Sequence, residues 1–328
     1  MTPDPEGLIT SAAVSIDEIR IAAHGLHGVA LRTSLVPAPG LSELVGHSVY
    51  LKLESKQPTG AFKLRGAWNA VSQLSDDERA RGVITYSSGN HGQAVAFAAQ
   101  RLGIRAVIVM PETVPEAKLE GVKRWGGEIV LAGKTSEDRF AKAQEIVVAE
   151  GLTVIPPFDH PHIIAGQGTV GLEIVEDLPD VAGVAVPVGG GGLCAGVTTA
   201  IHALCPGSHV WAVEPVGSSA YGAAVQAGRP VRLDAVASVA DGLLPLSVGT
   251  LTFQHMYPRA QSVTVTDADI VAATRWLRDE LDIIAEPSGA ATTAALRSGA
   301  ILPDGPTVLV VSGGNIRPES IDRLAPVG

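Results

Sequence analysis

The chain has 328 residues, of which 46% are hydrophobic and 18% charged. A chain of this length is expected to form two domains or one large one, and its composition excludes a disordered or fibrous protein. The formal net charge of −10 argues against nucleic acid as a partner, because an acidic surface repels phosphate backbones.

The cysteine content and the apolar runs bear on the cellular compartment of the protein and on whether it enters a membrane. Two cysteines, Cys194 and Cys205, cannot build a disulfide framework and agree with a reducing compartment. Residues 1–7 carry two acids and two prolines, which is unlike a secretory signal. Residues 181–213 lack Asp, Glu, Lys and Arg, but Pro187 and four consecutive glycines interrupt them, so no membrane span is expected there. We therefore expect a cytoplasmic protein that does not enter the membrane.

Short runs rich in Val and Ile alternate with longer runs rich in Ala, a pattern typical of strand–helix units around a parallel sheet. Ser15 and Glu18 predict a capping box at the start of a first helix. The predicted strands are residues 49–53, 82–85, 106–110, 128–131, 184–188, 209–213 and 307–311. The predicted helices are residues 61–74, 92–102, 115–125, 136–150, 166–176, 193–204, 267–281 and 288–297. The predicted fold class is therefore α/β.

A turn-rich segment, residues 55–66, runs directly into a predicted helix and places Lys63 in its first turn. The positive end of the helix dipole disfavours an ammonium group and lowers the lysine pKa, as an amine nucleophile requires. For a lysine considered alone, a solvated surface position is the simpler interpretation.

Two further loops follow predicted strands and open helices. In residues 86–93, backbone N–H groups and small hydroxyls can surround an anion, although Ser88 or Asn90 alone would also serve as a helix cap. In residues 187–193, consecutive glycines let the backbone approach a phosphate closely. Both loops therefore predict a site for an anionic ligand.

The loop at residues 310–315 leaves the last predicted strand and places the Ser312 hydroxyl where it can meet a ligand heteroatom. By itself this segment would be an ordinary turn.

The glycine loop also permits a nicotinamide dinucleotide site. Gly190, Gly192 and Ala195 fit the G-x-G-x-x-G/A pattern, and Glu214 follows 214 − 190 = 24 residues after the first of them. This alternative assigns no task to Lys63. A ligand-binding protein without catalytic activity is a second alternative.

Taken together, the four loops resemble the tryptophan-synthase-β, or fold-type II, family of pyridoxal-phosphate enzymes, and within it the threonine dehydratase and serine racemase group. Residues 164–169, 240–242 and 286–290 support the likeness, which extends from about residue 31 to 315. The resemblance implies two α/β domains with open, twisted, parallel or mixed sheets flanked by helices. Residues 1–81 and 158–328 would form a large cofactor-binding domain, and residues 82–157 a small domain inserted in it.

The resemblance also implies roles for individual residues. Lys63 would form the internal aldimine with pyridoxal 5'-phosphate, with Phe62 packed beside the cofactor and Asn90 hydrogen-bonded to its ring hydroxyl. Ser312 would face the pyridine nitrogen, where a neutral hydroxyl leaves that nitrogen less protonated than a carboxylate would. The residues that would hold the phosphate are Gly189, Gly190, Gly191, Gly192 and Leu193.

By the same resemblance, the reaction would be α,β-elimination from L-threonine or L-serine to a 2-oxo acid and ammonia, with Lys63 as general base. Arg139 matches a substrate-gating arginine of the serine racemases, although a solvated helix arginine is the alternative. The residues that would bind the small amino-acid substrate are Ser87, Ser88, Asn90, His91 and Arg139. A homodimer is expected from the family.

The main alternative is a serine racemase or a bifunctional enzyme, because Ser88 occupies the position that supplies the second acid or base in serine racemases. Against it, Pro245 stands where those enzymes have a substrate-binding serine. A 3-hydroxyaspartate dehydratase is a further alternative. The family's divalent-cation site would here comprise Glu214, the Ser218 carbonyl and Ala220, and an alanine in place of a carboxylate makes cation binding doubtful.

Overall fold

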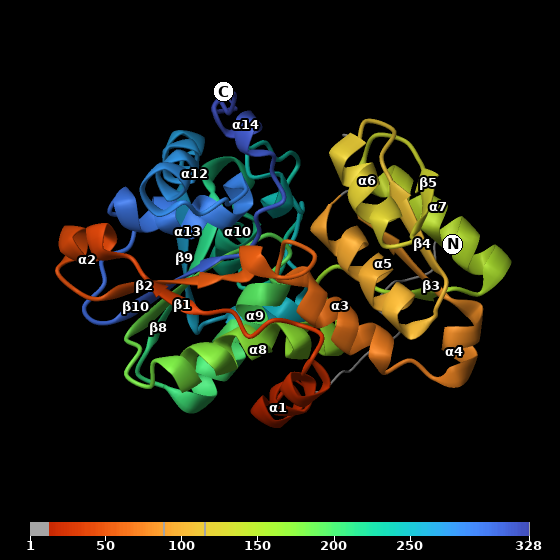
Figure 1. Ribbon diagram of the computed structural model, residues 1–328, viewed down its shortest axis with the longest axis horizontal. Helices are drawn as coiled ribbons and strands as arrows, with labels where there is room; N and C mark the ends of the chain where they lie inside the picture. Colours follow the sequence, from red (N-terminus) through yellow and green to blue (C-terminus); the bar gives the residue numbers. More distant parts are fainter. Residues whose placement is uncertain (1–12, 88, 115, 328) are drawn as a thin grey trace.

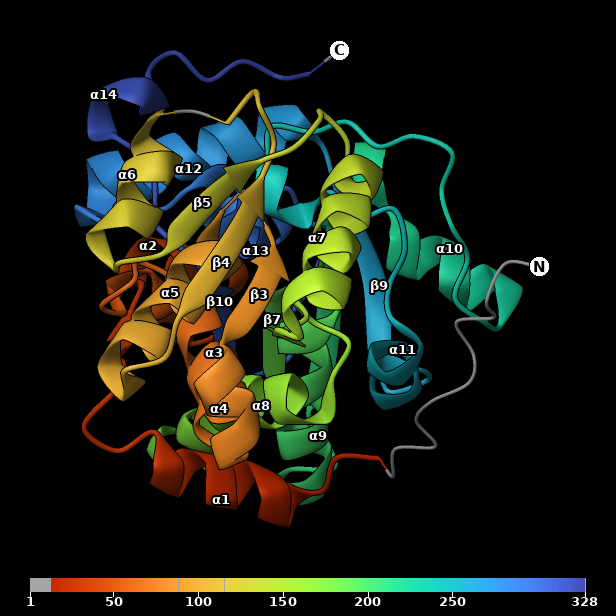
Figure 2. The same ribbon diagram turned by 90° about the vertical axis from the view of Figure 1, so that its right-hand side faces the viewer.

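The computed structural model describes residues 13–87, 89–114 and 116–327 and contains two β-sheets (Figures 1 and 2). In the larger sheet the spatial order is β1 (Leu35–Pro37), β2 (Val49–Leu53), β10 (Thr307–Val311), β7 (Gly183–Pro187), β8 (His209–Pro215) and β9 (Ala260–Val265). Only the β1–β2 pair among them is antiparallel. The smaller, fully parallel sheet has the order β5 (Glu128–Leu131), β4 (Ala106–Met110), β3 (Val83–Tyr86) and β6 (Thr153–Val154).

Helices cover both faces of the larger sheet. Along β10, Val308 and Val310 join one apolar core, whereas Leu309 and Val311 join the other, as the two-residue period of a strand requires. The first face is covered by α1 (Ile16–Gly25), α8 (Pro161–Asp177), α9 (Gly192–Leu204), α10 (Ala220–Ala227) and α11 (Thr250–Met256). The second face is covered by α2 (Pro39–Val45), α12 (Asp267–Leu281) and α13 (Pro287–Arg297) (Figure 1). Strands buried on both faces explain the nearly continuous apolar runs in the sequence.

The smaller sheet is also covered on both faces. Ile108 and Met110 of β4 pack with α5 (Asn90–Leu102) and α6 (Glu116–Arg124), whereas Val107 and Val109 pack with α7 (Ser136–Glu150). The link between the two sheets is α3 (Lys63–Ser72), which packs against both α5 and α8 (Figure 1). The remaining helices are α4 (Asp76–Arg81), α14 (Pro318–Ile321) and the short 3-10 helices Glu54–Lys56, Val216–Ser218 and Asp241–Leu243.

The predicted α/β class is confirmed, and every predicted strand coincides with an observed one to within two residues at either end. The capping box at Ser15 and Glu18 is present. The prediction missed β1, β6, β9, α2, α4, α10, α11 and α14, which apart from α10 have seven residues or fewer. It also began α8 at residue 166, whereas the helix starts at Pro161, because proline is favoured in the first turn and the His160 side chain caps it.

Parallel topology gathers the loops that the sequence analysis selected. β2, β10 and β7 run in the same direction, so the segments that follow Leu53, Val311 and Pro187 leave the same edge of the larger sheet. Ligands of open α/β sheets bind at this edge. Among the described residues, none of the helices has the length and apolar composition that crossing a bilayer requires.

Candidate active site

The segment before Lys63 is hydrogen-bonded to the segment that contains Ser312. The Phe62 N–H donates to the Ser312 carbonyl at 3.0 Å, and the Gly314 N–H donates to the Gly60 carbonyl at 2.9 Å. Gly60 has φ +73°, and a Cβ there would lie 2.1 Å from the Asn315 side chain, so this turn requires glycine. Two loops about 250 positions apart therefore form one unit.

Lys63 is the first residue of α3. Its Nζ donates to the Pro157 carbonyl at 2.6 Å and lies 5.1 Å from the centre of the Phe62 ring. Burial lowers the pKa of Lys63 to about 8, because a charged ammonium loses hydration there. The direction of the shift agrees with the prediction, but its cause is burial and not the helix dipole, and the lowered pKa suits the amine to nucleophilic and base chemistry.

The glycine loop ends at the first turn of α9. Gly191 is the N-cap with φ +95° and provides no side-chain cap, so the first N–H groups of the helix are left without intrahelical acceptors. A Cβ on Gly190 would lie 2.2 Å from the Phe158 ring, and the Gly190 carbonyl accepts from Thr252 Oγ1 at 2.8 Å. The loop is therefore fixed and free of side chains, which is the form that a phosphate site needs.

Asn90, the first residue of α5, lies in a directed hydrogen-bond chain. Its Nδ2 donates to Glu286 Oε1 at 2.6 Å, and its Oδ1 accepts from Asn315 Nδ2 at 2.8 Å. Asn315 also donates to the Thr59 carbonyl at 2.9 Å. Burial, together with the charge of Asp241, raises the pKa of Glu286 to about 7. This chain joins the loop of residues 86–93 to the segment before Lys63.

Sequence reasoning assigned no role to Glu286 or Asn315. Glu286 was noted only as part of a stretch that supports the family likeness, and Asn315 only as the end of the Ser312 loop. A polar residue in the loop that follows a buried strand, as at Asn315 four positions after β10, was the available signal.

Ser312 is 3% exposed, and its Oγ lies 3.5 Å from the Ser288 carbonyl. This distance is longer than an ordinary O–H···O hydrogen bond. The hydroxyl is therefore only weakly engaged by the Ser288 carbonyl, and its contact with a ligand atom stays a prediction.

The side chain of His91 is buried and contacts the protein backbone. It is 2% exposed, and its Nε2 lies 3.0 Å from the Ile155 carbonyl. Burial and the nearby charge of Lys63 lower the pKa of His91 to about 3, so the ring is neutral. If His91 binds a substrate carboxylate, the group that does so is its backbone N–H in the first turn of α5.

Ser87, another predicted substrate-binding residue, precedes this turn in the chain. The Ser87 Oγ accepts from the Gly89 N–H at 3.3 Å. Arg139 is half-buried in α7, next to Phe140, whose ring lies 5.2 Å from that of Tyr86 at the end of β3. Burial lowers the pKa of Arg139. Ser88 lies outside the described residues.

Glu214 does not have the surroundings of a cation ligand. Its two carboxylate oxygens accept the backbone N–H groups of Tyr221 at 2.7 Å and Gly222 at 2.9 Å, and burial raises its pKa to about 7. Ala220 offers no side-chain oxygen, and the part of the chain that the structure describes holds no group of three His, Cys, Asp or Glu suited to a metal. The residues present do not fit a hard divalent cation, which favours charged oxygen ligands.

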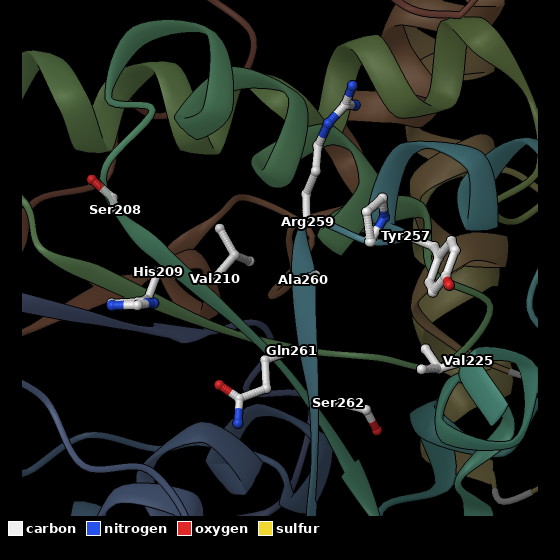
Figure 3. Close-up of a pocket in the computed structure, with 10 residues that line it drawn as sticks. Ser208, His209, Val210, Val225, Tyr257, Arg259, Ala260, Gln261 and Ser262 are labelled. Carbon is white, nitrogen blue, oxygen red and sulfur yellow. The ribbon is translucent and has the colours of Figure 1, made fainter.

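A surface hollow of about 470 Å³ lies elsewhere (Figure 3). It is lined by residues at the amino ends of β8 and β9, including His209 and Ala260, and thus lies at the opposite edge of the sheet from Ser312. Figure 3 shows the side chains of Arg259 and Gln261 pointing in opposite directions, so they do not converge on one ligand.

These features define a class of protein: an α/β enzyme with a buried lysine whose pKa is lowered to about 8 and with a glycine-capped helix terminus at the same edge of the larger sheet. A family model described as "Pyridoxal-phosphate dependent enzyme" matches residues 28–313, and the chain belongs to this family. The nicotinamide interpretation of the glycine loop is therefore not supported.

The chain is similar both to proteins named as threonine ammonia-lyases or deaminases and to a protein named as a serine racemase. An L-threonine ammonia-lyase of Thermotoga maritima is 39% identical over 312 residues, covering 95% of this chain and 78% of the relative. The solved structure of maize serine racemase matches with a TM-score of 0.90 and 34% identity, covering 95% of this chain and 97% of that one. The solved structure of a threonine deaminase from T.th. matches with a TM-score of 0.87 and 38% identity, covering 92% of this chain and 99% of that one.

The observed residues fit pyridoxal phosphate. Lys63 supplies the amine, and the loop at Gly191 carries no side chain where it meets the first turn of α9. Ser312 supplies a weakly engaged hydroxyl.

The low pKa of Lys63 predicts how cofactor attachment depends on pH. Only the deprotonated amine attacks an aldehyde, so the rate at which cofactor-free protein takes up pyridoxal phosphate should rise with pH and level off above about pH 8. Stopped-flow absorbance measures this rate. A rate that is still rising at about pH 10, as for an ordinary lysine, would contradict the burial argument.

Proposed function

We propose that this protein is an L-threonine/L-serine dehydratase, which converts a 3-hydroxy amino acid to a 2-oxo acid and ammonia. The observation that carries the proposal is the Lys63 amine, whose pKa of about 8 makes it competent as a base, beside a glycine-capped helix terminus. The names of its relatives, L-threonine ammonia-lyase and threonine deaminase, support this reaction over others of the family.

Different residues of the chain bind the cofactor, bind the substrate and remove the substrate's proton. Pyridoxal phosphate, when bound, withdraws electrons from the substrate's α-carbon and so acidifies its proton. Neutral Lys63 removes that proton as general base, while the N–H groups at the start of α9 hold the phosphate. The N–H groups at the start of α5, including that of His91, bind the substrate carboxylate. Loss of the β-hydroxyl as water, and later addition of water with release of ammonia, balance the reaction.

We further propose that residues 82–157 form a small domain and that the substrate enters between it and the rest of the chain. The four-stranded sheet is built from residues 83–154, and three ion pairs join its helices to the remainder. These pairs are Lys118–Asp241, Glu137–Arg232 and Glu120–Arg317. Arg139 lies in the same helix as Glu137, which supports a gating role at this boundary.

We also propose that the protein is a cytoplasmic homodimer and that it acts on a small amino acid. This part of the proposal rests on the composition and on family likeness. Light scattering of the purified protein measures the assembly.

Racemisation of serine is the second candidate, favoured by the TM-score of 0.90 with maize serine racemase. One experiment separates the two. The purified protein is mixed with L-threonine or L-serine, and its visible spectrum, the 2-oxo acid and the chirality of the remaining substrate are measured together. We expect 2-oxo acid to form faster than D-serine. D-serine appearing first would establish the racemase, and a chromophore without turnover would overturn both.

A further inference from the structure

Glu286 is a buried carboxylate in the site to which the reaction assigns no task. It is 7% exposed and precedes the first turn of α13. Its backbone N–H donates to the Gly313 carbonyl at 3.1 Å, and a Cβ on Gly313 would lie 2.3 Å from Glu286 Oε1. The glycine after Ser312 therefore leaves the space in which this carboxylate lies.

The hydrogen-bond chain fixes which way the Asn90 amide points. Both N–H donors of Asn315 are used, one on the Thr59 carbonyl and one on Asn90 Oδ1, so Asn315 can present only a donor to Asn90. On the other side, Glu286 Oε1 accepts one hydrogen of Asn90 Nδ2 at 2.6 Å, so the nitrogen of the Asn90 amide lies on the Glu286 side. Asn90 thus keeps one N–H for a ligand, with its oxygen held away.

We propose that Glu286 is a positioning residue: by accepting from Asn90 Nδ2 at 2.6 Å, it holds the amide so that an N–H, and not the carbonyl, faces the cofactor's ring hydroxyl. The inference rests on the proposed function, which places Asn90 beside that hydroxyl. Asn315 would still donate to Asn90 Oδ1 without Glu286, but Asn90 Nδ2 would lose its acceptor, so the direction of its second N–H would no longer be fixed. The cofactor's electronic state would then vary from molecule to molecule.

The test compares the holoenzyme with Glu286→Ala, Glu286→Gln and Asn90→Ala. We expect Glu286→Ala to shift the visible absorbance maximum of the bound cofactor in the same direction as Asn90→Ala, and kcat/KM to fall about tenfold, the loss for one hydrogen bond to a charged group. Glu286→Gln keeps an acceptor oxygen and nearly the same volume, so it should retain the wild-type spectrum. The double variant of Glu286→Ala and Asn90→Ala should add nothing to Asn90→Ala alone.

An unchanged spectrum in Glu286→Ala, with Asn90→Ala shifted, would overturn the proposal. A merely structural role would lower thermal stability equally in Glu286→Ala and Glu286→Gln without moving the spectrum, and would overturn it as well. If the wild type carries the chromophore but yields neither 2-oxo acid nor D-serine, the proposed function fails, while the spectral comparison still decides the role of Glu286.

Discussion

Lys63→Ala should abolish both the visible absorbance of bound pyridoxal phosphate and the formation of 2-oxo acid. Under the proposed function, the Nζ that donates to the Pro157 carbonyl is the amine that attaches the cofactor and takes the α-proton. Loss of a general base alone lowers rates by about 10²–10⁴-fold, and loss of the attachment point adds to this. We therefore expect a fall in kcat of about 10⁴-fold or more, measured by keto-acid assay with the absorbance spectrum of the same sample.

Lys56→Ala is the matched control for this substitution. Lys56 belongs to the same loop region, but its side chain is exposed, so its removal should leave the spectrum and the turnover unchanged. Added primary amines supply a free base and should restore part of the activity of Lys63→Ala if the fold and the cofactor site are intact. Turnover by Lys63→Ala that approaches the wild-type rate would contradict the assignment of Lys63.

The parts of the site that lie next to one another in the sequence could be predicted from it. Lys63 with its turn-rich segment, and the four glycines before α9, are local patterns whose chemistry follows from helix termini and backbone freedom. The strands could be predicted for a similar reason: both faces of β7 and β10 are buried, so their apolar runs are continuous. The two-residue strand β6 carries no such pattern.

Side-chain partners distant in the chain could not be predicted. Glu286 and Asn90 are 196 positions apart, and no periodicity connects them. Likewise, the family resemblance offers Glu214 as a cation ligand, but only the structure shows the N–H groups of Tyr221 and Gly222 on its carboxylate. The spacing of residues in the sequence predicts which residue types lie near a site. Which acceptor each hydrogen-bond donor contacts depends on how the helices and strands pack.

A buried group of charges stabilises the helix that carries Lys63, and it predicts the largest effect on stability. Arg65, two positions beyond Lys63, donates to both oxygens of Glu54, each at 2.8 Å, and to Glu173 at 2.6 Å. Lys52 donates to Glu173 at 2.6 Å and to the Thr33 carbonyl at 2.7 Å. Two cations thus face two anions, and the group joins β2, α3 and α8.

Glu54→Ala should lower the free energy of unfolding by about 3–5 kcal/mol, because it leaves the buried charges of Arg65 and Lys52 with one carboxylate between them. Denaturant titration followed by circular dichroism measures this change. Glu128→Ala is the control: Glu128 also contacts an arginine, Arg105, at 2.8 Å, but both side chains are about half exposed, so the loss should be about 0–1 kcal/mol.

Replacing Glu54 and Arg65 together with leucine separates charge from packing. The double variant removes one cation with one anion and leaves Lys52 paired with Glu173, so it should be less destabilised than Glu54→Ala although it changes more atoms. If the two variants lose equal stability, the cost lies in lost hydrogen bonds and packing instead of unpaired charge. In that case the group would hold α3 through its shape alone, and the position of Lys63 would not depend on the charge balance behind it.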